Sequence, residues 1–157
     1  WVIVQNIGTA IFSLFMGPLA DRFGNRLVLR IVLLAIAAMP PVAIGLSYWD
    51  GWGQFLYPGV FLFIGLTPVG FKTISNFTLE ISATGDHPKY LSTLGLCFAL
   101  PLLASPFLGW VAEATNFEVV FFPISAIILL GWLFTFRLDE PRDGYIDEVV
   151  GGLPEGS

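Results

Sequence analysis

The stretch GPLADRFGNR, from Gly17 to Arg26, separates two long apolar runs and decides how the rest of the chain is arranged. It carries three charged residues within six positions, in a chain that is 55% hydrophobic and only 12% charged. The flanking runs, residues 1–20 and 27–48, each have about the 20 residues that a helix needs to cross a bilayer. We therefore expect a short turn at a membrane surface that joins two membrane-spanning helices.

The composition argues against a soluble domain, because a mean hydropathy of +0.79 leaves too little charge for a water-facing surface. A net charge of −5 gives no sign of a nucleic-acid partner. The single Cys and single His exclude a disulfide framework and a metal centre built on these residues. No catalytic triad and no phosphate-binding glycine loop is present. We expect no enzyme activity and no cofactor, with membrane lipid as the surrounding partner.

Five apolar runs of near-membrane length follow one another along the chain. They are residues 1–20, 27–48, 55–79, 91–112 and 119–136. Backbone polar groups must be satisfied internally within lipid, and the alternating ten-residue segments of a β-barrel are absent, so the runs must be helices. The sequence predicts an all-α integral membrane protein, with a transmembrane bundle over residues 1–136 and an acidic tail over residues 137–157.

The basic residues predict the orientation of the bundle. With five spans, six of the seven Lys and Arg residues fall on the side of the charged turn and the C-terminal tail. These six are Arg22, Arg26, Arg30, Lys89, Arg137 and Arg142. Because cytoplasmic connections carry the excess of positive charge, we expect that side and the C-terminus to be cytoplasmic. The seventh basic residue, Lys72, lies within a span.

The charged turn resembles a signature of the major facilitator superfamily, G-x-L-A-D-R-x-G-R-K/R, which joins the second and third helices of each six-helix half. The matching residues are Gly17, Leu19, Ala20, Asp21, Arg22, Gly24 and Arg26. The resemblance implies a secondary transporter that moves a small-molecule substrate by alternating access, here in a bacterial cytoplasmic membrane. Two alternatives remain: a plain capped turn with snorkelling arginines, or a polytopic sensor or assembly factor that uses the same fold.

Three residues of the turn have roles that their chemistry alone suggests. Gly24 allows the positive φ of a very tight turn. Gly17 lets a helix end approach a neighbour closely. The Asp21 carboxylate can accept from free N–H groups at a helix start and complement the helix dipole.

The resemblance also implies a gate, in which the turn pairs with a carboxylate on the fourth helix of the half. Glu80 stands at the matching position. Asn25 occupies a position where the family usually has a basic residue, so Arg22 or Arg26 would have to make this pairing.

The chain is expected to be a fragment, because Trp1 already lies inside an apolar run. Two features favour assigning the five spans to helices 8–12 of a twelve-helix transporter. One is the acidic tail, and the other is the likeness of residues 76–90 to the junction of the tenth and eleventh helices. An N-terminal half is left open, because residues 105–110 resemble a motif of the fifth helix. In the favoured case the missing N-terminal half of the same chain is the partner of this bundle.

Polar residues within the spans are the candidates for a substrate path. Lys72, Asn76 and Glu80 follow one another at intervals of four and share a helix face. Residues 67–70, just before Lys72, are expected to loosen this helix where it approaches the cavity. Ionisable residues in a span are functional candidates by default. Lys72 has two equally weighted roles: lining a cavity, or joining helices through a carboxylate.

A second polar set lies in the first span. Gln5 and Thr9 share one face of that helix, and Asn6 lies beside them. They are candidates for lining the substrate path, with helix packing as the alternative.

Overall fold

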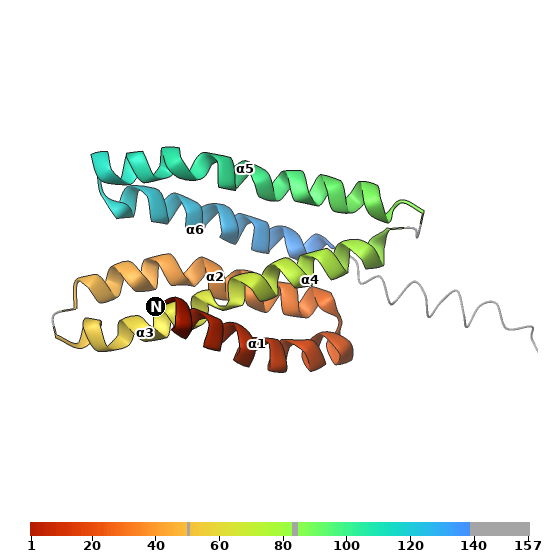
Figure 1. Ribbon diagram of the computed structural model, residues 1–157, viewed down its shortest axis with the longest axis horizontal. Coiled ribbons are helices and arrows are strands. Elements are labelled where there is room, and N and C mark those ends of the chain that lie inside the picture. Colours follow the sequence, from red (N-terminus) through yellow and green to blue (C-terminus); the bar gives the residue numbers. More distant parts are fainter. Residues whose placement is uncertain (50, 83–84, 139–157) are drawn as a thin grey trace, which may run out of the picture.

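The structure, a computed structural model, describes residues 1–49, 51–82 and 85–138 (Figure 1). Its elements are α1 Val2–Phe23, α2 Asn25–Ser47, α3 Trp52–Ile64, α4 Leu66–Ile81, α5 His87–Ala114, α6 Phe117–Phe134 and the 3₁₀ turn η1 Thr135–Arg137. Counting Trp52–Ile81 as one, five helical segments are long and apolar enough to cross a membrane. The expectation of an all-α membrane protein is confirmed. The predicted tail from residue 139 onward lies outside the described residues.

The turn between the first two helices consists of Gly24 alone. α1 continues to Phe23 and α2 begins at Asn25, so the charged residues of the turn belong to the helix ends. Gly24 has a φ of 88°, the positive value that the sequence predicted and that residues with a Cβ rarely adopt. We call the side of the bundle that carries Gly24 the turn side, and the opposite side the far side.

The third span is broken at Gly65, where α3 ends and α4 begins. Pro68 explains the break, because it has no N–H to donate to the carbonyl of Ile64 and its ring crowds that carbonyl. The sequence predicted one span over residues 55–79, loosened at residues 67–70. The break falls just before that segment, since a proline disturbs the helical turn that precedes it.

The centre of the bundle is α2, which contacts α1, α3, α4 and α6. Val28 and Val32 of α2 are completely buried and pack with Leu66 of α4. Phe12 and Met16 of α1 cover this cluster from the other side. The core therefore joins α1, α2 and α4.

α5 lies along one edge of the bundle, beside α6 (Figure 1). None of its residues is buried. Edge-to-face contact between the rings of Phe71 and Phe98, with centroids 4.6 Å apart, connects it to α4. α5 thus keeps most of its surface open to lipid or to a further helix.

Candidate functional site

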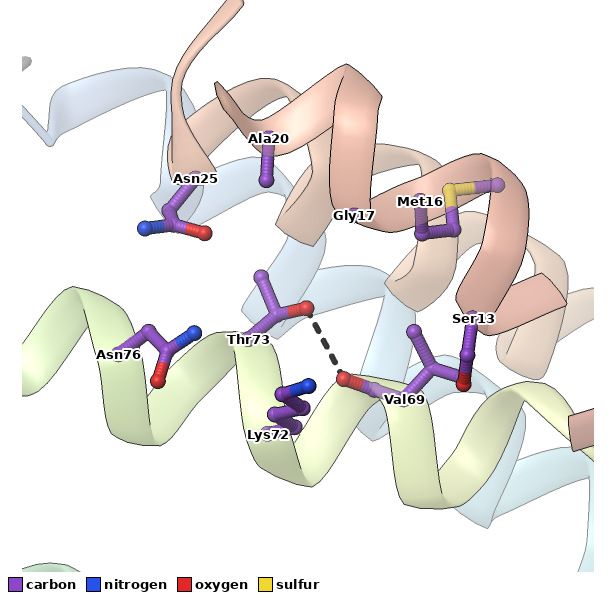
Figure 2. A pocket seen from close by; sticks show the side chains of 9 residues that line it. All are labelled: Ser13, Met16, Gly17, Ala20, Asn25, Val69, Lys72, Thr73 and Asn76. Carbon is purple, nitrogen blue, oxygen red and sulfur yellow. Dashed lines mark hydrogen bonds between the residues drawn. The ribbon is translucent and has the colours of Figure 1, made fainter. Parts of the chain in front are cut away.

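A small cavity lies between α1 and α4 near the turn side (Figure 2). It is lined by Ser13, Met16, Gly17 and Ala20 of α1, Asn25 of α2, and Val69, Lys72, Thr73 and Asn76 of α4. Its volume is about 50 Å³, enough for one or two water molecules. The structure thus brings the candidate residues Lys72 and Asn76 to one place with Gly17 of the turn motif.

Lys72 supplies the charge of this cavity. Its side chain is exposed, and no carboxylate of the described residues lies within ion-pair distance of it. The alternative in which Lys72 joins two helices therefore has no partner carboxylate in the described part of the chain.

Some of the other polar side chains of the cavity already have a hydrogen-bond partner, and some do not. The Thr73 hydroxyl donates to the Val69 carbonyl at 2.9 Å, within its own helix (Figure 2). Ser13 and Asn76 are exposed, and their side chains make no hydrogen bond with any described residue. Together with Lys72, these two side chains are the groups that can bind something within the cavity.

A hydrogen bond spans the turn-side end of the cavity. The Asn25 amide nitrogen donates to Glu80 Oε1 at 2.8 Å, which ties the start of α2 to the last turn of α4. Asn25 is buried, with 5% of its surface exposed. Sequence reasoning treated Asn25 as a departure and assigned the Glu80 contact to Arg22 or Arg26. The structure shows a hydrogen bond to Glu80 from Asn25 itself, and a pairing of Arg22 or Arg26 with Glu80 stays a prediction.

The charged residues of the turn sit on the two helix ends. Asp21 and Arg22 lie in the last turn of α1, and Arg26 in the first turn of α2. The residue that precedes α2 is Gly24, which has no side chain to cap the helix. The helix-capping role of Asp21 stays a prediction. The Arg22 guanidinium lies over the ring of Phe23, 5.3 Å from its centroid.

Gly17 does not make the close helix contact that the sequence predicted for it. A Cβ built on Gly17 would meet no atom within 4 Å, because this face of α1 borders the cavity. The close contact occurs nine residues earlier in α1, where a Cβ on Gly8 would clash with the Leu62 carbonyl. Gly65 meets the backbone of α1 equally closely.

The polar residues of the first span belong to this close contact and not to the cavity. The Thr9 hydroxyl lies 3.0 Å from the Gly65 carbonyl and 3.1 Å from the Gln5 carbonyl, and it donates to both. Gln5 is half-buried and Asn6 is exposed, and neither lines the cavity beside Lys72. The structure therefore separates Gln5, Asn6 and Thr9 from Lys72 and Asn76.

Arg30 makes a contact that sequence reasoning missed. The sequence placed it with the basic residues of the turn side, and its Nη2 donates to the Thr135 carbonyl, at the turn-side end of α6, at 3.0 Å. Its guanidinium also lies over the ring of Phe136, 4.3 Å from the centroid. Arg30 thereby holds the end of α6 against α2. Its position one helical turn inside a span was the available signal, since such a cation needs partners within the protein.

On the far side, a polar contact joins α2 to α6. The Tyr48 hydroxyl, just after α2, donates to the Glu118 carboxylate in the first turn of α6. This hydrogen bond and the carboxylate charge raise the pKa of Tyr48 above its usual value. Elsewhere in the described ranges, no three His, Cys, Asp or Glu residues are grouped as a metal site would need.

The comparison with protein families agrees with this geometry. The model of the Major Facilitator Superfamily matches residues 1–152. The chain belongs to the major facilitator superfamily. The superfamily is one of membrane transporters, and the five apolar helices make this chain an integral membrane protein. Neither the curated proteins nor the solved structures gave a match.

Proposed function

We propose that these helices form five of the six helices in one half of a secondary transporter, which moves a small solute by alternating access. The family membership supports transport in general. Substrate sites of such transporters lie between helical repeats, and one repeat rocks against another around them. The complete unit would then need the other half, which we expect on the same polypeptide.

The observation that carries this proposal is the position of the cavity behind the Asn25–Glu80 hydrogen bond. The cavity contains an exposed ammonium and two exposed polar side chains, in a segment that otherwise faces lipid or apolar residues. Asn25 lines the cavity, and Glu80, which accepts its hydrogen bond, lies about one helical turn beyond Asn76 toward the turn side. Breaking this hydrogen bond would let α4 move away from the start of α2, so the hydrogen bond is well placed to act as a gate.

The competing function is that of a sensor or assembly factor without transport. Such a protein has no use for an unneutralised cation in its spans, so Lys72 should be paired within the bundle. The lack of a partner for Lys72 among the described residues favours the transporter.

We further propose that the turn side is cytoplasmic, because the basic residues gather there. Topology reporters fused after Gly51, Gly85 and Gly144 test this orientation. We expect an external location for Gly51 and an internal one for Gly85 and Gly144. An external signal at Gly85 would reverse the proposed orientation.

Uptake by the intact transporter in proteoliposomes, measured over a panel of radiolabelled solutes, tests the function. Lys72→Ala should lower uptake of the transported solute at least tenfold without changing membrane insertion or thermal unfolding. Lys89→Ala is the matched control, because Lys89 is exposed and pairs with Asp86 outside the spans. Residues 1–157 alone should give no uptake. If the intact protein takes up none of the solutes in the panel, the result would favour the sensor or assembly factor.

A further inference from the structure

We infer that the cavity between α1 and α4 binds an anionic group, such as a carboxylate or a phosphate, with Lys72 as its counter-ion. The inference rests on the proposed function in one respect only, namely that this cavity is where a solute binds. It adds the charge of that solute, which neither the family nor the motif specifies.

The polar side chains of the cavity without a hydrogen-bond partner among the described residues can all act as hydrogen-bond donors. Lys72 offers an ammonium, which only donates, while the Asn76 amide and the Ser13 hydroxyl can each donate to an anion. Figure 2 shows the α4 side chains across the cavity from Ser13 of α1. Among the described residues, the lining contains no Asp or Glu. A cationic solute would therefore meet a like charge there with no carboxylate to offset it.

The carboxylate nearest along the same helix face already has a partner. Glu80 lies eight residues after Lys72, about 12 Å along the axis at ~1.5 Å per residue. Its Oε1 accepts the hydrogen bond from Asn25, at the turn-side end of the cavity. Glu80 is thus placed to close the cavity and not to neutralise Lys72.

The basic residues around the turn extend the same sign of charge. Arg22 and Arg26 stand on the helix ends next to the cavity mouth, although Asp21 and Glu80 offset part of their charge. Clefts lined by one sign of charge and walled by apolar material concentrate counter-ions. An ammonium within a span is stabilised most by water or an anion beside it.

The electrostatic preference of the cavity can be measured without knowing the solute. Cys97 is the single cysteine of these 157 residues and is exposed, so Cys97→Ser, together with serine at any cysteine elsewhere in the intact protein, gives a background without thiols. Ser13→Cys then places a thiol across the cavity from Lys72. The probes are sulfonatoethyl methanethiosulfonate, an anion, and trimethylammonioethyl methanethiosulfonate, a cation, applied to the intact protein in membranes.

We expect the anionic reagent to be favoured at this thiol, and Lys72→Gln to lower the ratio of anionic to cationic labelling rates about tenfold. This magnitude corresponds to reversing the probe charge a few ångströms from an ammonium in a water-filled cavity. Lys72→Arg should retain the ratio. Thr93→Cys on α5, which lies outside the cavity lining, should show a ratio that does not depend on Lys72.

A ratio that Lys72→Gln leaves unchanged would overturn the inference and would mean that Lys72 only snorkels to surface water. Failure of both reagents at Ser13→Cys, with normal labelling at Thr93→Cys, would overturn it as well, because the cavity would then be dry. This readout needs no transport. An anion preference in a protein that moves no solute would contradict the proposed function alone, whereas uptake without the preference would contradict the anion site alone.

Discussion

α1 meets the third span in two regions that differ in almost every respect. Toward the far side, Gly8 and Gly65 bring the two backbones into direct contact, and the Thr9 hydroxyl bonds the Gly65 carbonyl. Toward the turn side, a Cβ on Gly17 would meet no described atom within 4 Å, and a cavity separates α1 from Lys72 of α4. One helix pair thus passes from dry backbone contact to a polar opening within a few turns.

The difference between the close backbone contact and the cavity indicates which end of this helix pair can move. Small residues and an interhelical hydrogen bond hold helices together in lipid, so the Gly8–Gly65 contact is the fixed point. α4 starts immediately after this point, where the broken helix supplies a joint. Beyond it, only side-chain contacts such as Asn25–Glu80 hold α4 near the start of α2. We therefore expect α4 to pivot at Gly65 while the turn-side end opens and closes.

The largest effect is expected when one methyl group is added at the Gly8–Gly65 contact. Gly8→Ala should lower the free energy of unfolding by about 1–3 kcal/mol, because the new Cβ would overlap the Leu62 carbonyl and force the backbones apart. Gly17→Ala is the matched control in the same helix, where the added methyl enters open space. Thermal unfolding in detergent measures both variants. Equal stabilities would show that the two regions are packed alike.

The second test opens the turn-side end. Asn25→Ala removes the hydrogen bond to Glu80, and a hydrogen bond to a charged group is worth about 1.5–3 kcal/mol. The thiol from Ser13→Cys, in the Cys97→Ser background, should then react with N-ethylmaleimide about tenfold faster. Asn25→Lys should slow the reaction, because a charge pair would replace a neutral donor. Asn6→Ala, on the exposed face of α1, should leave the rate unchanged. A rate insensitive to Asn25 would mean that this hydrogen bond does not control access.

The smallest effect is expected on the far side, at Tyr48 and Glu118. The protonated Tyr48 phenol donates to Glu118, so its folded-state pKa lies above the unfolded value of about 10. The stabilisation is present below the unfolded pKa and is lost as the pH rises through the raised folded-state pKa. Ultraviolet titration should show one tyrosine ionising later than the rest, and Glu118→Gln should remove that delay. Tyr48→Phe should change stability less than Gly8→Ala, since Tyr48 is exposed and solvent screens the pair.

The five spans could be predicted because run length and hydropathy are direct consequences of bilayer thickness. The break at Gly65 could not be predicted from hydropathy, which continues across it. Its local signal was Pro68, and the sequence prediction placed the disturbance at residues 67–70, just after the break. The positive φ of Gly24 was predictable because so short a connection leaves the backbone few conformations.

The sequence predicted which residues of the candidate site share one helix face, but it did not predict which helices come together at the site. The four-residue interval placed Lys72, Asn76 and Glu80 on one face, and the first two do line the cavity. The interval also grouped Gln5 with Thr9, but it gave no sign that α1 touches α3 there and leaves α4 further along. The contacts of Asn25 and Arg30 join residues 55 and 105 positions apart, so a local pattern could not reveal them.

The division of the third span at Gly65 also matters when the protein is made. α3 has 13 residues and α4 has 16, which give about 20 Å and 24 Å of helix. Each is shorter than the ~30 Å hydrocarbon layer, so neither can be inserted by itself. The translocation machinery must therefore accept both as one stop-transfer element before α5 is synthesised. A few charged residues inserted at Gly65 would leave two segments too short to span, and α5 and α6 would then cross the membrane in the opposite direction.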